Sequence, residues 1–433
     1  MNHTSFKIAA AALAVASALS STAYAGGFQL TEQSALALGR AYAGVGVDGT
    51  DVSGMYYNAA TMTLHPGTQV QFGGVGVGLN LEYVAKDGEK NNGRAKEEVI
   101  PHGFISHQIN DSTWVGLAIT VPYGLATDYG DNWSGKDHGT KAEITVINFN
   151  PNVAWKATDT LSLGAGLALQ YVDATFGVGA NTPIGNIHSE YTATDFTWGF
   201  NVGLMWQPVE NLRFGLSYRS ETKHATNGDL TISGTNGNGQ NSIDGTYNAS
   251  VTVSGPAWAM ATAAWDVNDY LSLYATFRWA DWSSFSSLTT TSNELTTAVY
   301  GVATSNPMLA GGYKAVFDQL KNIDNDWKDT YLMSVGYDLR VNSFWTLRGG
   351  IAYETSPIDD KTKRTAIIPD ADRWWFAIGS SFHWTKDFQT DIGFAHLHGV
   401  HERSLYDSQT KEEIGRYRHL DAYLLGVQMQ YRF

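Results

Sequence analysis

The chain contains no cysteine among its 433 residues, so disulfides, thiolate metal ligands and cysteine nucleophiles are all excluded. Basic residues are also few: 28 Lys and Arg stand against 42 Asp and Glu, a formal net charge of −14. This balance argues against nucleic acid as a partner. After the first 25 residues there is no uncharged apolar run of about eighteen residues, which a transmembrane helix needs. The membrane-spanning structure still open to this chain is a closed β-barrel.

Residues 1–25 have the pattern of a signal peptide. Lys7 supplies a weakly basic start, Ile8 to Leu19 is a short apolar core, and Ala23-Tyr24-Ala25 fits the small-x-small cleavage rule. The apolar run is too short and too rich in alanine for a membrane anchor. We therefore expect an exported protein whose mature chain begins at Gly26.

Most of the remaining sequence alternates apolar and polar residues, as β-strands with two different faces do. Six short polar connections recur, and the connections between them are long and rich in Gly, Asn, Asp, Ser and Thr, such as 226–244 and 283–326. The short ones are 109–111, 156–160, 207–211, 266–269, 340–343 and 385–387. With both termini on the short-turn side, six short turns require seven long loops and fourteen strands. The expected fold is all-β, a 14-stranded antiparallel transmembrane barrel.

Tryptophan positions favour a membrane barrel over a soluble sandwich, which would also alternate. Trp155, Trp206, Trp265 and Trp384 each directly precede a short turn, and Trp345 follows one. Indole rings prefer the level of the lipid headgroups, so tryptophans at one height on successive hairpins predict an aromatic girdle.

The two ends of the strand region predict how the barrel closes. Residues 423–433 alternate and end on Phe433, so the last strand can pair with the first, near 68–81, and leave no free edge. In that first strand the apolar positions change from even to odd numbers at Gly73-Gly74, which predicts a β-bulge there.

The stretch from Gly26 to Pro66 follows neither pattern. It is built from small residues, with two short helix-like pieces: Thr31 can cap one that runs to about Leu38, and Asn58 can cap another from Ala59 to about Leu64. Irregular backbone survives at membrane depth only where protein or a cavity surrounds it. We therefore expect this stretch to lie in the barrel lumen.

These residues carry a family resemblance. GFQLTEQSALALGRAYAG and YYNAATM resemble the hatch of the FadL-type outer-membrane transporters for long-chain fatty acids and other hydrophobic compounds, and later blocks such as GLSYRSETK and LRGGIAYETSPI follow in family order. The hatch of this family carries an Asn-Pro-Ala motif, which corresponds to Asn58-Ala59-Ala60 here, without the proline. The resemblance implies a hatch domain at 26–66 and a barrel at 67–433.

The resemblance also implies a location, a cargo and partners. It places the protein in the bacterial outer membrane, where it takes up hydrophobic compounds passively, without a cofactor and not as an enzyme. The partners it implies are the hydrophobic ligand, the bilayer with its lipopolysaccharide, and the assembly machinery that reads a terminal aromatic residue. We expect a monomer.

The segment Pro122-Tyr123-Gly124 follows a regular strand, where proline has no N–H for pairing and glycine weakens the strand. A kink or an interruption of the pairing is expected. In FadL-type proteins a kinked third strand opens a lateral hole in the wall, so the resemblance makes these residues a lateral gate. The plainer interpretation is that Pro122 marks the end of the strand at its loop.

For the ligand site, the resemblance puts Phe28 near the cargo. Ala174 and Phe176, at the outer end of the strand that begins at Leu161, are further candidates, but that end carries no basic residue for a carboxylate. Basic residues on the lumen face of other strands are the remaining candidates, although lumen arginines commonly pair with lumen acids. They are Arg219, Arg278, Arg348 and Arg373. Long-chain fatty acids are the expected cargo, with toluene-like aromatic or aliphatic hydrocarbons as the alternative.

Two other classes of membrane barrel are weaker hypotheses. A general porin would have an open lumen, which the plug-like first forty mature residues disfavour, and a barrel enzyme would need a Ser/His/acid group that the sequence does not reveal. His396, His398 and His401 can ligate a metal, but strand-rim histidines without a metal are the preferred interpretation, so no metal site is predicted.

Overall fold

The computed structural model describes residues 26–93, 98–182, 185–235, 242–285, 287–305, 311–312, 314, 317, 322–401, 403–407 and 410–433. The expected signal peptide, residues 1–25, lies outside the described residues. Among those residues, no helix is long and apolar enough to cross a membrane.

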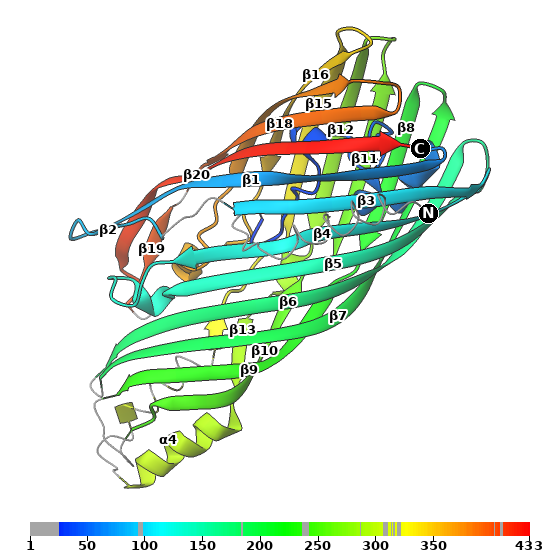
Figure 1. The fold of residues 1–433 in the computed structure, drawn as a ribbon. Coiled ribbons are helices and arrows are strands. Elements are labelled where there is room, and N and C mark those ends of the chain that lie inside the picture. The colour runs from blue at the N-terminus through cyan, green and yellow to red at the C-terminus, as the bar shows by residue number, and fades with distance from the viewer. Residues whose placement is uncertain are drawn as a thin grey trace.

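The predicted fold is confirmed: antiparallel strands form a closed barrel with fourteen wall strands (Figure 1). Two of them are interrupted and carry two labels each, as at Pro256, where proline cannot donate to its neighbour. The wall strands are β1 (Thr68–Ala85), β3 (Glu98–Asn110), β4 (Thr113–Asp128), β5 (Lys141–Lys156), β6 (Leu161–Thr182), β7 (Gly185–Val209), β8 (Leu212–Arg219) with β9 (Thr222–Thr235), β10 (Gly245–Gly255) with β11 (Trp258–Asp266), β12 (Leu271–Ala280), β15 (Thr330–Arg340), β16 (Trp345–Glu354), β17 (Arg373–His383), β18 (Phe388–Gly399) and β20 (Glu413–Arg432).

Smaller elements lie in the connections between wall strands. The helix α4 (Asn293–Ser305) stands at the end of the barrel opposite to the C-terminus (Figure 1). The others are β2 (Lys90–Asn91), β13 (Ser287–Thr291), β14 (Asn322–Asp324), β19 (Ser404–Tyr406) and the 3-10 turns η2 (Lys136–His138), η4 (Trp282–Ser284) and η5 (Lys361–Lys363).

All six predicted short turns join consecutive wall strands, and the predicted girdle is exposed beside them. Trp155, Trp206, Trp265 and Trp384 are 52%, 48%, 48% and 57% exposed, far more than core tryptophans are, whereas Trp345, the fifth predicted member, is half-buried. Their alternate neighbours point into the barrel, since successive side chains of a strand face opposite sides. The barrel thus presents an apolar, aromatic outer face to lipid.

The last strand pairs with the first from Gln69↔Arg432 to Ala85↔Gly415, which closes the sheet as predicted. The predicted bulge at Gly73-Gly74 is wrong, because the register runs unbroken there and shifts instead between Glu82 and Tyr83. The apolar positions of this strand change from even to odd numbers for another reason. Phe72 faces lipid, whereas Val75 and Val77 face inward and are buried in the core that includes the plug.

Residues 26–66 lie inside the ring of strands, as the blue segment in Figure 1 shows, and nearly all of them are buried. They form α2 (Ala35–Leu38), α3 (Gly54–Tyr57) and the 3-10 helix η1 (Ala59–Leu64). Asn58 caps η1 as predicted, because its side chain accepts a hydrogen bond from the Ala60 N–H. The prediction for Thr31 is wrong: Ser34 caps α2, accepting from the Ala37 N–H. We call residues 26–66 the plug; its boundary as a separate domain stays a prediction.

Candidate functional site: the plugged lumen and the β4 wall

The wall changes at Pro122, in the middle of β4. Opposite β5 the register jumps from Thr120↔Asn148 to Tyr123↔Val146, so two residues of β4 face one residue of β5. The strand therefore does not end at Pro122, as the plainer interpretation held. It bulges there and continues to Asp128.

Pairing with the other neighbour stops at the same level. Strand β3 pairs with β4 from Asn110↔Thr113 only as far as Gly103↔Ile119, and no later residue of β4 pairs with β3 in the described parts of the chain. Residues 120–125 are all buried, which breaks the alternation of a wall strand. This stretch of β4 has moved inward from the wall surface.

The plug supplies the missing partner. The Leu30 N–H donates to the Pro122 carbonyl over 2.8 Å, and the Gly124 N–H donates to the Phe28 carbonyl over 3.0 Å. Between them, Gln29 and Tyr123 form an antiparallel bridge. The first residues of the plug thus act as an extra strand on the free edge of β4 and satisfy its backbone groups.

A side chain reinforces this junction. The Gln33 amide donates to the Val121 carbonyl over 2.7 Å, and its oxygen accepts from the Val121 N–H over 3.1 Å. Both backbone groups at the bulge are therefore satisfied by the plug instead of by β3. If the plug moved, the buried backbone groups of β4 at the bulge would lose these hydrogen bonds. The conformation of the bulge therefore depends on the position of the plug.

Phe28 lies at the centre of an aromatic cluster. Its ring is 4.8 Å from the Trp282 ring, 5.6 Å from Phe285 and 5.9 Å from Tyr123, each in an edge-on arrangement, and Trp327 completes the set. All five are buried. Tyr123 belongs to β4, Phe28 belongs to the plug, and the other three come from the long connection between β12 and β15, so the cluster joins the plug, the bulge and the outer side of the barrel.

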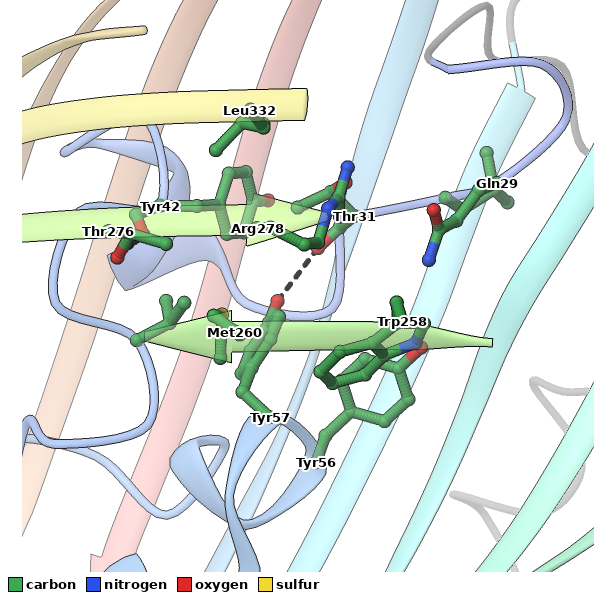
Figure 2. A pocket seen from close by; sticks show the side chains of 12 residues that line it. Gln29, Thr31, Tyr42, Tyr56, Tyr57, Trp258, Met260, Thr276, Arg278 and Leu332 are labelled. Carbon is green, nitrogen blue, oxygen red and sulfur yellow. Dashed lines mark hydrogen bonds between the residues drawn. The ribbon is translucent and has the colours of Figure 1, made fainter. Parts of the chain in front are cut away.

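A narrow pocket lies beside this junction (Figure 2). Plug residues and wall residues together line it, and within the plug the Tyr57 hydroxyl donates across it to the Thr31 carbonyl over 2.7 Å. The space between them holds about one water molecule, so the plug fills this pocket in the present state. The lining residues are Gln29, Leu30, Thr31, Tyr42, Val45, Tyr56, Tyr57, Trp258, Met260, Thr276, Arg278 and Leu332.

Three of the four arginines predicted for the lumen are held by carboxylates. Arg278 Nη2 is 2.7 Å from Glu354 Oε1, Arg348 Nε is 3.2 Å from Asp338 Oδ1, and Arg373 Nη2 is 2.9 Å from Asp370 Oδ1. A buried pair of this kind is already neutralised. These arginines anchor the wall and the plug, and only Arg278 also lines the pocket.

Arg219 differs from the other three. It is fully buried, and among the described residues no acid lies within ion-pairing distance of its guanidinium. Its Nη2 donates to the Tyr56 carbonyl at 2.8 Å and to Asn150 Oδ1 at 2.9 Å, while Nε and Nη1 have no hydrogen-bond partner there. The guanidinium lies 4.6 Å from the Tyr56 ring and 5.7 Å from the Trp258 ring, both of which line the pocket. Arg219 is therefore a buried cation next to the pocket, and its Nε and Nη1 could still donate hydrogen bonds to a ligand.

The plug carries an unusual carboxyl group, Glu32, two residues from the β4 junction. It is completely buried, and neither carboxylate oxygen has a hydrogen-bond partner among the described residues. Burial, with a smaller contribution from the charge of Glu354, raises the pKa of Glu32 to about 7. Glu32 is a plug residue outside the membrane-spanning strands, and its charge state changes near neutral pH.

Elsewhere the plug is bound firmly to the wall. Arg40 pairs with Asp48 of the plug and with Asp338 of β15, and Asp51 accepts from Gln428 of β20 over 2.8 Å. The Asn58 amide donates to the Leu204 carbonyl of β7 over 2.9 Å, so this motif residue both caps η1 and attaches it to the wall.

Wall glycines allow this close contact. A side chain at Gly164 or Gly203 would strike the backbone of Ala60 or the side chain of Asn58, and one at Gly350 would strike the Arg40 carbonyl. Sequence reasoning missed these positions. The signal was present, because each is a glycine inside an otherwise regular strand.

Not every predicted ligand residue reaches the pocket. Ala174 is buried and Phe176 half-buried at the outer end of β6, where they pack against the main core, but neither lines the pocket. Residues that do line it, such as Trp258 and Met260 of β11, were not predicted because they look like ordinary strand residues.

Comparison with known proteins agrees with this architecture. The family model described as "Outer membrane protein transport protein (OMPP1/FadL/TodX)" matches residues 16–433. The long-chain fatty acid transport protein of Escherichia coli strain K12 is 27% identical over 470 residues, covering 98% of both chains. The 47 kDa outer membrane protein of Pasteurella multocida is 26% identical over 452 residues, covering 98% of this chain and 97% of that one.

Solved structures share the fold. A Pseudomonas aeruginosa FadL homologue superposes with a TM-score of 0.80 at 21% identity, covering 94% of this chain and all of that one. The toluene transporter TodX of Pseudomonas putida superposes with a TM-score of 0.71 at 17% identity, covering 93% and 99%. At these identities the likeness concerns the fold alone.

Proposed function

Because this chain belongs to the OMPP1/FadL/TodX family of outer membrane transport proteins, we propose that its cargo is long-chain fatty acids, taken up passively and released sideways through the wall. The membership places it in the outer membrane as a transporter of hydrophobic compounds. The choice of cargo and the sideways route go beyond what family membership shows, and both are argued from the geometry of the site. The observation that carries the proposal is the junction at which the plug forms the missing partner of β4.

The route follows from that junction. When residues 28–30 leave β4, the Pro122 carbonyl and the Gly124 N–H lose their partners, and β3 does not pair with β4 at this level. The same displacement enlarges the pocket, because Gln29, Leu30 and Thr31 form one of its sides. One movement of the plug thus makes room for an apolar chain and opens a path to the lipid. Burial of the acyl chain, which contributes about 0.8 kcal/mol per CH₂, supplies the affinity, so no energy source is needed.

Two observations support a fatty acid. Arg219 stands beside the pocket, and two of its donor nitrogens have no hydrogen-bond partner in the described parts of the chain, which suits a carboxylate, since charge-assisted hydrogen bonds are the strong ones. The sequence relatives with 98% mutual coverage include proteins named for long-chain fatty acid transport. We propose that the acyl chain occupies the enlarged pocket and that the carboxylate contacts Arg219.

Toluene-like hydrocarbons remain the second candidate cargo. The aromatic cluster around Phe28 favours them, because aromatic rings pack well against edge-on aromatic partners. A hydrocarbon would use the same route and make no use of Arg219. A general diffusion porin is the weakest alternative, since the plug occupies the lumen.

Other features are proposed on general grounds. The terminal Phe433 follows a regular last strand, which suits the outer-membrane assembly machinery, and the exposed girdle suits a bilayer that carries lipopolysaccharide. We propose a monomer. The relatives are named as transport or outer membrane proteins, and the absence of enzymatic activity stays a prediction.

Growth of the host tests the cargo. A strain without this gene should grow poorly on low concentrations of oleate and normally on toluene, and the wild-type gene should restore growth on oleate. An Arg219→Gln gene should restore it only in part. Normal oleate uptake together with lost hydrocarbon uptake would reverse the choice of cargo.

A further inference from the structure

A cluster of histidines and one acid lies on the outer face of the barrel, level with the exposed aromatic residues Phe376 and Tyr423 of the neighbouring strands. Along β18, Ile392 and Phe394 are exposed on the outer face, and His396 and His398 follow with the same parity. In the register of the two strands, His398 lies opposite Asp421 of β20, which has the parity of the lipid-facing residues that follow it. The cluster therefore stands at the outer end of the wall, away from the lumen.

The potential ligand atoms of this cluster converge. His398 Nδ1 is 2.7 Å from Asp421 Oδ1, and His396 Nε2 is 3.9 Å from the same oxygen. One ligand atom from each of the three residues lies within 4.8 Å of the others. Ligand atoms around a tetrahedral zinc ion are separated by about 3.3 Å, given bonds of about 2.0–2.1 Å. Small rotations of the side chains would produce that spacing.

Two further observations point to an ion. His396 Nε2 is shielded from solvent and has no hydrogen-bond partner among the described residues, and its ring is held by parallel stacking on Tyr423 at 4.7 Å. A third imidazole is close, with His419 Nδ1 3.9 Å from Asp421 Oδ2. The register shift at Glu82 and Tyr83 leaves Arg418 unmatched on β1 and pairs His419 with Glu82, which brings His419 to the outer face.

We propose that His396, His398 and Asp421, with His419 as a fourth ligand, bind one divalent transition-metal ion, for which Zn²⁺ is the probe. Two or three imidazoles and one carboxylate are a ligand set that zinc accepts and that magnesium and calcium disfavour. The ion would replace the hydrogen bond between His398 and Asp421. This site lies outside the lumen, so it is independent of the cargo.

Of the three histidines that the sequence singled out, only two are in this cluster. His401 Nδ1 is 3.1 Å from Asp372 Oδ2 and belongs to a separate pair. The sequence could not reveal the site, because Asp421 and His419 are distant in the chain and reach the histidines only through the pairing of β18 with β20.

Calorimetric titration of the full mature protein in detergent with ZnCl₂, after removal of any histidine tag, tests the proposal. We expect one ion per chain, a loss of affinity of at least about tenfold in His398→Gln, and no saturable binding of MgCl₂. The matched control His401→Gln should bind zinc like the wild type. A heat-dependent shift in gel mobility verifies that each variant is a folded barrel.

Either of two results would overturn the site. One is the absence of saturable zinc binding by the folded wild type. The other is an equal loss of affinity in folded His398→Gln and His401→Gln, which would assign the ion to a different place.

Discussion

We propose that a single side chain, Arg219, sets the preference for a class of ligand. Replacing it with Gln removes the charge but keeps donors, and a charge-assisted hydrogen bond contributes about 1.5–3 kcal/mol. We expect oleate to bind the Arg219→Gln protein about 10- to 150-fold more weakly. Oleyl alcohol, which has the same chain without the carboxylate, should bind both proteins alike. Equal losses for acid and alcohol in a fluorescence displacement assay would mean that Arg219 only supports the fold.

Glu32 predicts a pH dependence of stability. Its pKa is raised by burial from 4.5 to about 7, so the folded state holds this proton where the unfolded chain has lost it. Stability should therefore fall as pH rises from about 4.5 to about 7, by up to about 3 kcal/mol. Glu32→Gln should flatten this part of the profile and should be more stable than wild type at pH 8. Denaturation followed by tryptophan fluorescence at pH 5 and pH 8 measures both; an unchanged slope in the variant would contradict the assignment.

At the scale of elements, the contact between the plug and β4 can be locked. Gln29 and Tyr123 face each other in an antiparallel bridge flanked by two hydrogen bonds, a pair whose Cα atoms are typically about 4.5 Å apart. The chain has no cysteine of its own, so a Gln29→Cys, Tyr123→Cys variant has no competing thiol. Oxidation should block oleate uptake, and reduction should restore it.

The two single-cysteine variants are the controls for this lock, since they change the same side chains without a bond. Mass spectrometry gives the fraction cross-linked. Full uptake by a completely cross-linked protein would show that the cargo does not need this junction to open.

A wall glycine tests how tightly the plug fits. An added side chain at Gly350 meets the Arg40 backbone, whereas one at Gly76, on the lipid side of β1, comes no nearer than 3.6 Å to a neighbouring atom, Leu425 O. We expect Gly350→Ala to destabilise the protein by about 1–3 kcal/mol and to raise ion leakage, because overpacking displaces the plug. Gly76→Ala should have little effect on either. Unfolding in urea and conductance in planar bilayers provide the two measurements.

At the scale of the whole molecule, the barrel and the plug together decide what passes. Wild-type protein should conduct ions weakly, because residues 26–66 fill the lumen, and deletion of those residues should produce a large, steady conductance. Gel mobility must show that the deleted protein is still a barrel; if it is not, Gly350→Val is the substitute. Strong conductance by intact wild type would rule out a plug.

The sequence alone determined the barrel, its strand number, its short turns and its girdle, because these depend on periodicity and on local turn chemistry. It also identified the plug and the cap at Asn58, which are local signals. It failed where local rules competed with distant contacts. Val75 and Val77 face inward, where they are buried in the core that includes the plug, and Ser34 caps α2 in place of Thr31.

Only the tertiary structure decided the site. Side-chain type shows that Arg219, Arg278, Arg348 and Arg373 are cations, but their roles depend on which acids the closed sheet brings beside them. The same is true of the β4 edge, since its partner comes from the plug, more than ninety residues earlier, and not from β3. Periodicity is a property of neighbours along the chain, whereas ion pairing and edge completion are properties of neighbours in space.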